Sequence, residues 1–218
     1  MKGGKMHRPV VFLDLDFTLY DTDSLIQLIN EKLAAMGHDL ADVKRHVNEL
    51  NDIGFSFPRL LERLGHTPAM AAVASPEFER LLALGNCLLM DGVVPALERV
   101  AKVADLVLVT YGYPPYQIEK YRHLTDLHPL ITECHFVWRG ITKGDVIRSY
   151  GRQRPLVFWD DSPSHLADVK SKSPLTVCVR AMWPAFKPAA HVEDGQRWRT
   201  VDTVEKFADL VCNVFDDS

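Results

Sequence analysis

Five short apolar segments of the chain predict buried strands. Each is about as long as a typical strand, is rich in Val, Leu or Phe, and shows little alternation of polar and apolar residues. This pattern is typical of interior strands in a parallel sheet, which are covered on both faces. We expect strands at 9–14, 105–110, 134–138, 156–160 and 175–180.

Segments with helical spacing of apolar residues separate most of these strands. Their first residues are proline or side chains that cap helices, which marks where each helix begins. A chain that alternates strand and helix in this way favours an α/β fold with a doubly wound, Rossmann-like parallel sheet. The expected helices begin at Pro95, Thr142, Ser162 and Asp202.

The segment between the first two predicted strands is too long for a single crossover helix. Residues 21–89 show helical spacing of apolar residues, for example at Leu25 and Ile29. A segment of this length can bury a small core of its own. We therefore predict an α/β core domain formed by 1–20 and 90–218, with a helical cap domain, 21–89, inserted after the first strand.

Several polar residues stand where the predicted strands end. In an open α/β sheet the carboxyl ends of the strands share one edge, and ligands bind there. Neighbouring carboxylates repel each other, so a cluster of them favours a cation site, and oxygen ligands suit Mg²⁺. The residues are Asp14 and Asp16 after the first strand, Thr110 at the end of the second, Asp160 and Asp161 at the end of the fourth, and Lys143 at the start of the preceding helix.

This arrangement resembles the four motifs of the haloacid dehalogenase (HAD) superfamily, in the same order along the chain. The place of the helical segment resembles the type 1 cap of that family. Phe17 stands where glycine is most common in the first motif, and we expect variation to be tolerated there. The matching residues are Asp14, Asp16 and Thr18 in the first motif, Thr110 in the second, Lys143 in the third, and Asp160 with Asp161 in the fourth.

The resemblance implies a catalytic role for four of these residues. Asp14 is expected to be the nucleophile that forms an aspartyl-phosphate. Asp16 is expected to protonate the leaving oxygen and then activate water, with a pKa raised by its acidic neighbours. Thr110 and Lys143 are expected to bind the transferring phosphoryl oxygens, and Lys143 to keep Asp14 ionised.

The resemblance also implies a Mg²⁺ site. Asp14 and Asp161 are expected to ligate the ion directly, and Asp16 to ligate it through its backbone carbonyl. Asp160 is expected to bind it either directly or through water. The ion would offset the repulsion between the nucleophile and an incoming phosphate.

Two further stretches are candidates for substrate recognition. Tyr111 and Gly112 begin "YGYPPY" (111–116), which either lines the substrate entrance or is a stiff loop that ends the strand. In the predicted cap, Arg59, Arg63 and His66 are candidates to meet an anionic or polar substrate tail; a solvated helix face is the alternative for them.

These expectations favour a Mg²⁺-dependent phosphatase that hydrolyses a small phosphorylated metabolite. Asp16 disfavours dehalogenation, which needs no acid two residues after the nucleophile. A phosphosugar mutase of the same superfamily shares every core residue and remains an alternative. A receiver-type signalling module also gathers Asp, Thr and Lys around Mg²⁺, but it phosphorylates an Asp on a middle strand and lacks the long insert.

Composition excludes several other classes of protein. The net charge of −4 is spread along the chain without a long basic stretch, which argues against a nucleic-acid partner. No apolar run approaches transmembrane length and no signal peptide is evident, so we expect a cytoplasmic protein that does not bind membranes. The widely spaced cysteines form no C-x-x-C pair, which fits a reducing compartment. The oligomeric state is not encoded in any pattern we recognise.

Overall fold

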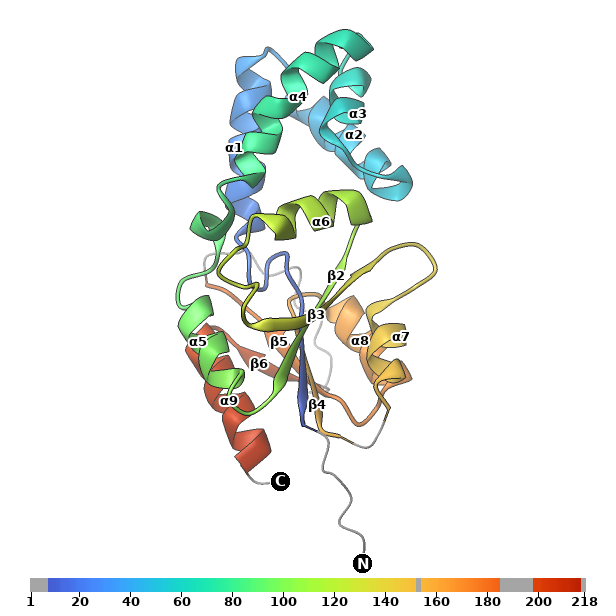
Figure 1. The fold of residues 1–218 in the computed structure, drawn as a ribbon. Helices are drawn as coiled ribbons and strands as arrows, with labels where there is room; N and C mark the ends of the chain where they lie inside the picture. Colours follow the sequence, from blue (N-terminus) through green and yellow to red (C-terminus); the bar gives the residue numbers. More distant parts are fainter. Residues whose placement is uncertain (1–7, 152–153, 185–197, 217–218) are drawn as a thin grey trace, which may run out of the picture.

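Six parallel strands form one sheet in the computed structural model, which describes residues 8–151, 154–184 and 198–216. The strand order is β3-β2-β1-β4-β5-β6, so the chain winds in both directions from β1 (Figure 1). The α/β doubly wound fold expected from the sequence is confirmed. The strands are β1 (Val10–Leu13), β2 (Asp105–Tyr111), β3 (Ile131–Val137), β4 (Leu156–Asp160), β5 (Val177–Ala181) and β6 (Arg199–Val201).

Helices follow the strands and also fill the long segment after β1. None of the described helices is long and apolar enough to cross a lipid bilayer. The segment after β1 contains α1 (Thr22–Ala35), α2 (Leu40–Ile53), α3 (Phe57–Arg63) and α4 (Pro68–Leu82), which we call the helical insert, and then a 3₁₀ helix (Gly85–Leu88). The remaining helices are α5 (Val93–Val100), α6 (Pro114–Arg122), α7 (Lys143–Ser149), α8 (Pro163–Lys172) and α9 (Val204–Asp216).

The two faces of the sheet bury two separate apolar clusters. Side chains alternate across a strand, so Val11 and Leu13 of β1 face one way and Val10 and Phe12 the other. The first pair packs in the cluster that includes α5 and α9, and the second pair packs in the cluster that includes α7 and α8. In Figure 1 these helix pairs lie on opposite sides of the sheet.

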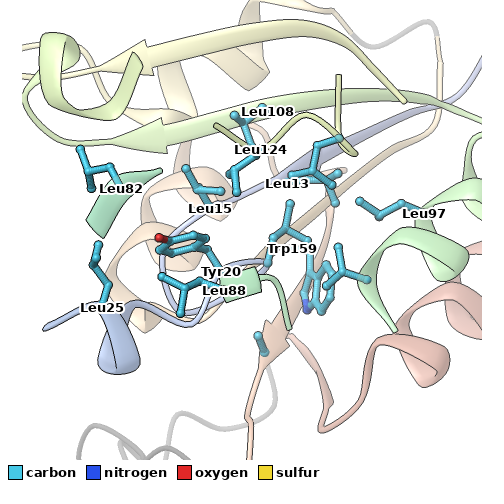
Figure 2. Packing of buried hydrophobic residues seen from close by; sticks show 14 of the residues in the cluster. Leu13, Leu15, Tyr20, Leu25, Leu82, Leu88, Leu97, Leu108, Leu124 and Trp159 are labelled. Atoms are coloured by element: carbon cyan, nitrogen blue, oxygen red, sulfur yellow. The ribbon is translucent and has the colours of Figure 1, made fainter. Parts of the chain in front are cut away.

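The helical insert lies beyond α6, at the end of the sheet where the strands finish (Figure 1). Its apolar side chains belong to the same cluster as those of α5 and α9. Figure 2 shows this continuity: Tyr20, which follows β1, lies near Leu15 and Leu88. Tyr20 also forms a β-bridge with Leu89, so the two chain segments that join the insert to the core are tied together.

Two elements differ from the sequence prediction because their patterns are weak. The predicted strands are all present, but β6 was not predicted, since it is a three-residue edge strand. Helix α6 was also missed, although proline occupies its first positions.

The stack of Trp159 from β4 on Phe207 from α9 is a test of the packing between sheet and helix. The two rings are parallel, their centroids lie 3.9 Å apart, and both are fully buried. Phe207→Ala leaves a cavity and is expected to lower the free energy of unfolding by about 3–5 kcal/mol in urea denaturation. The matched control Val73→Ala, at a side chain that is 80% exposed on α4, should change it by less than about 0.5 kcal/mol.

Candidate active site

The order of the sheet brings three strand ends together. Strand β1 pairs with β2 on one side and with β4 on the other, and Leu13 lies opposite both Leu108 and Trp159. The backbone N–H of Asp14 donates a hydrogen bond to the carbonyl of Trp159, 2.9 Å away. The strand order reverses at β1, and in doubly wound sheets this reversal is where ligands bind.

Three carboxylates converge at this point. Oxygen atoms of Asp14, Asp160 and Asp161 all lie within 4.8 Å of one another, and Asp14 and Asp160 are buried. The backbone N–H of Asp161 donates to the hydroxyl of Thr18, 3.1 Å away, which ties the loop after β1 to the end of β4. We call these three residues the carboxylate cluster.

One lysine pairs with the carboxylate cluster. The buried Nζ of Lys143 lies 2.5 Å from Oδ1 of Asp14 and 2.6 Å from Oδ2 of Asp160. Lys143 is the first residue of α7, whose start is fixed by a capping box between Thr142 and Asp145. The capping box therefore fixes the position of the Lys143 ammonium group, which pairs with Asp14 and Asp160.

The acids of the cluster carry more negative charge than Lys143 balances. Burial raises the pKa of Asp14 well above its ordinary value; Lys143 lowers it, and the charges of Asp160 and Asp161 raise it further. Burial and the charge of Asp160 raise the pKa of Asp161 to about 6. Burial also acts on Asp160, but Lys143 and His165 outweigh it and hold the pKa of that carboxyl below its usual range.

This donor set fits a divalent cation. Carboxylate oxygens are the ligands that Mg²⁺ prefers. A cation among the three acids would supply the positive charge that Lys143 alone does not, and would favour their ionised forms. Among the described residues, the carboxylate cluster is therefore best placed to hold a metal ion. Its members are three of the four metal ligands expected from the sequence, and the fourth is Asp16.

Asp16 lies outside the carboxylate cluster, in a different environment. Its Oδ1 accepts hydrogen bonds from Thr22, at 2.6 Å, and from Nζ of Lys120, at 2.5 Å, and its Oδ2 accepts one from Nε2 of Gln117, at 2.9 Å. Burial raises the pKa of Asp16, but Lys120 and these hydrogen bonds outweigh it, so the net pKa is lowered. The expectation that acidic neighbours raise this pKa was wrong, because the nearest charge is Lys120.

Sequence reasoning missed four residues at this site. Lys120 is only 2% exposed, and its Nζ also lies over the rings of Tyr20 and Tyr116. The one available signal was the spacing of Gln117 and Lys120, which places both on one face of a helix. The missed residues are Thr22, Gln117, Lys120 and His165, whose Nδ1 lies 3.2 Å from Oδ2 of Asp160.

The end of β2 supplies the remaining sequence candidates. The hydroxyl of Thr110 is buried and has no hydrogen-bond partner in the described part of the chain, so it is available to a ligand. Gly112 has φ +151°, and a Cβ there would lie 2.7 Å from Nε2 of Gln117, so only glycine fits. The "YGYPPY" stretch is thus partly strand end and partly the start of α6.

A cavity of about 800 Å³ lies between the helical insert and the core. Asp16, Tyr111 and Gly112 line it from the core side. That this cavity is a substrate entrance, as one of the two sequence interpretations has it, stays a prediction.

The basic candidates of the insert do not line this cavity. Arg59 donates a hydrogen bond to the carbonyl of Gly54, 3.0 Å away, and Arg63 pairs with Glu49. Nε2 of His66 lies 2.9 Å from Nε2 of His38. These three side chains therefore have partners within the insert, and their contact with a substrate tail stays a prediction.

Metal binding to the carboxylate cluster predicts a change in stability that does not depend on activity. A ligand that binds only the folded state stabilises it, by about 2.7 kcal/mol when its concentration is a hundred times its dissociation constant. We therefore expect MgCl₂ to raise the melting temperature of the metal-free protein, and Asp161→Asn to abolish most of that rise.

The control for this measurement is Asp105→Asn, at the opposite end of the sheet, where Asp105 pairs with Arg8. That variant should keep the wild-type response to MgCl₂. An equal Mg²⁺ response in Asp161→Asn and wild type would show that the cation binds elsewhere.

Comparisons with known proteins bear on the fold. No protein-family model and no curated protein matches the sequence significantly. Among solved structures, similarity extends over nearly the whole chain. YfnB, a candidate HAD hydrolase from Bacillus subtilis solved with bound magnesium, shares 18% identity (TM-score 0.61; 95% of this chain, 99% of that chain).

Two further structures represent other activities. A candidate β-phosphoglucomutase from Thermotoga maritima shares 21% identity (TM-score 0.67; 95% and 100% of the two chains). A 2-haloacid dehalogenase from Pseudomonas syringae shares 18% identity (TM-score 0.57; 96% and 100%). Proteins with these different activities share one architecture, so the structural similarity indicates the fold and not the activity. The chain has the fold of the haloacid dehalogenase-like hydrolases.

Proposed function

We propose that the protein is a Mg²⁺-dependent phosphatase that hydrolyses the phosphomonoester of a small molecule through an aspartyl-phosphate on Asp14. The observation that carries the proposal is the convergence of the carboxylate cluster with Lys143 at the end of β1, next to strand β2, whose Thr110 hydroxyl has no hydrogen-bond partner among the described residues. A nucleophile, a site for a divalent cation and two donors for phosphoryl oxygens thus occupy one strand edge.

The carboxylate cluster is where the metal ion is proposed to bind. Asp14, Asp160 and Asp161 would hold it with their side chains, and Asp16 with its backbone carbonyl. Bound there, the ion supplies the positive charge that offsets the repulsion between the nucleophile and the phosphate. The remaining chemistry comes from side chains of this chain.

In the first step, a carboxylate oxygen of Asp14 attacks phosphorus and the ester oxygen leaves. Lys143, paired with the same carboxylate, and Thr110 stabilise the negative charge on the transferring oxygens. The leaving alcohol needs a proton. Asp16, whose carboxylate pairs with Lys120 2.5 Å away, is the proposed source of that proton through Lys120.

In the second step, water attacks phosphorus of the aspartyl-phosphate and loses a proton, while the bond from phosphorus to Asp14 breaks and inorganic phosphate leaves. The lowered pKa of Asp16 means that its carboxylate is ionised, which is the form a general base requires. Thr22, Gln117 and Lys120 hold this carboxylate in place. The network therefore supports the base role of Asp16 directly, and its acid role through Lys120.

The proposal predicts that Asp14→Asn abolishes turnover of p-nitrophenyl phosphate, because an amide is not a nucleophile toward phosphorus. The rate should fall by about 10³-fold or more, measured as p-nitrophenol and inorganic phosphate released. Asp105→Asn is the matched control and should keep the wild-type rate. EDTA should abolish activity and added Mg²⁺ restore it.

Two results would contradict parts of this proposal. A near-wild-type rate in Asp14→Asn would remove the nucleophile assignment. Phosphoryl transfer to a second sugar molecule, without release of inorganic phosphate, would favour the mutase alternative that shares the same core residues.

A second prediction concerns Lys120. Lys120→Met keeps the length of the side chain but removes the cation that pairs with Asp16, so the carboxylate loses its counter-charge and its fixed orientation. We expect kcat for p-nitrophenyl phosphate to fall by about 10- to 100-fold. Lys102→Met, at an exposed lysine after α5, is the control. A folded Lys120→Met protein with unchanged kcat would show that the pair is not used in catalysis.

A further inference from the structure

We propose that the substrate is a phosphomonoester of a hydrophobic alcohol, with the organic group bound in the cavity between insert and core and Phe17 as a specificity-determining residue. The inference rests on the proposed phosphatase function and adds the class of substrate to it. Three observations carry it: the lining of the cavity, the sparse charge along it, and the backbone of Phe17.

Most side chains on the insert side of the cavity are apolar, and its polar members there are Thr22, Asn30, Lys44, Asn48 and Asn51. Two of the side chains there expose large apolar surfaces, Ile26 at 43% and Leu40 at 44%, although both belong to helices with buried faces. Apolar surface of this kind gains free energy when a ligand removes it from water. The apolar lining residues of the insert are Leu25, Ile26, Ile29, Leu40, Val43, Val47, Phe55 and Leu60.

Few charged groups line the cavity. Of its described lining residues only Asp16, Lys44 and Lys120 carry charge, and Lys120 pairs with Asp16. Lys44 is an exposed residue of α2. Recognition of a second phosphate or a carboxylate uses convergent basic side chains, with arginine favoured. The lining contains no arginine among the described residues, so it favours a substrate whose charge is confined to the reacting phosphate.

Phe17 places an aromatic ring at the catalytic end of the cavity. Its φ is +58°, in the left-handed region that bulky side chains rarely adopt and that glycine adopts freely. Hydrogen bonds hold this backbone: the N–H of Phe17 donates to the carbonyl of Tyr20, 3.0 Å away, and Nε1 of Trp183 donates to the carbonyl of Phe17, 2.8 Å away.

A phenylalanine in this conformation is less favourable than glycine for the backbone. Phe17 lines the cavity together with its neighbour Asp16 and with Tyr111, which is 46% exposed. An apolar group attached to the scissile oxygen would contact this ring first. Phe17 thus links the catalytic carboxylates to the aliphatic part of the cavity.

The test is a series of straight-chain alkyl phosphates from ethyl to hexyl, with a hexose phosphate as a bulky polar comparison. Inorganic phosphate release gives kcat/KM for each ester. In wild type, kcat/KM should rise by up to about fourfold per added methylene, the effect of burying one such group. The hexose phosphate should be a poorer substrate than hexyl phosphate.

Two variants and a matched control test which residues cause kcat/KM to rise with the length of the alkyl chain. Phe17→Gly suits the observed backbone and should still fold, yet lower kcat/KM for hexyl phosphate by about tenfold. Ile26→Asn should make the rise with chain length shallower. Ile53→Asn changes an isoleucine of α2 that is 47% exposed but does not line the cavity, so it should keep the wild-type rise.

The outcomes separate this inference from the function on which it rests. Phosphate release with no dependence on chain length, or a preference for the hexose phosphate, would overturn the inference and leave the phosphatase standing. A Phe17→Gly protein whose kcat/KM depends on alkyl chain length as in wild type would overturn the role of Phe17. No phosphate release from any ester, p-nitrophenyl phosphate included, would contradict the phosphatase itself and the inference with it.

Discussion

The repulsion among buried carboxylates at the end of β1 is the constraint on which the site depends. Asp14 and Asp160 are buried beside each other, with Asp161 adjacent, and burial disfavours their charged forms. Lys143 offsets part of this cost through its contacts with two of the acids. Such an arrangement lowers the stability of the folded state and is typical of functional sites. The remaining charge is what a divalent cation would balance.

Two carboxylates two residues apart have opposite surroundings, and this difference separates their proposed roles. Burial and the neighbouring acids raise the pKa of Asp14 in spite of Lys143, whereas Lys120 and hydrogen bonds outweigh burial and lower the pKa of Asp16. The separation comes from topology: α6 follows the end of β2 and lies between the sheet and the helical insert (Figure 1). The same helix lines the cavity, so catalysis and substrate recognition share one element.

Much of the fold was predictable from sequence because interior parallel strands are continuous apolar runs, and the polar residues that end them stand out. That is why the acids, Thr110 and Lys143 could be assigned to one edge. Helix α6 escaped prediction because its inward face carries Gln117 and Lys120 instead of an apolar stripe. The wrong expectation for Asp16 follows from that omission, since its counter-charge comes from the missed helix. Strand β6 escaped because a short edge strand, exposed at Arg199 and Thr200, has no apolar run.

The central claim is that Asp14 accepts the phosphoryl group beside a cation held by the carboxylate cluster. A crystal structure of the protein with Mg²⁺ and beryllium fluoride, a mimic of a bound phosphoryl group, tests it most directly. The account predicts beryllium fluoride bonded to a carboxylate oxygen of Asp14, with its fluorines near Thr110 and Lys143 and Mg²⁺ among the three acids. An unmodified Asp14 with the cation bound elsewhere would contradict it.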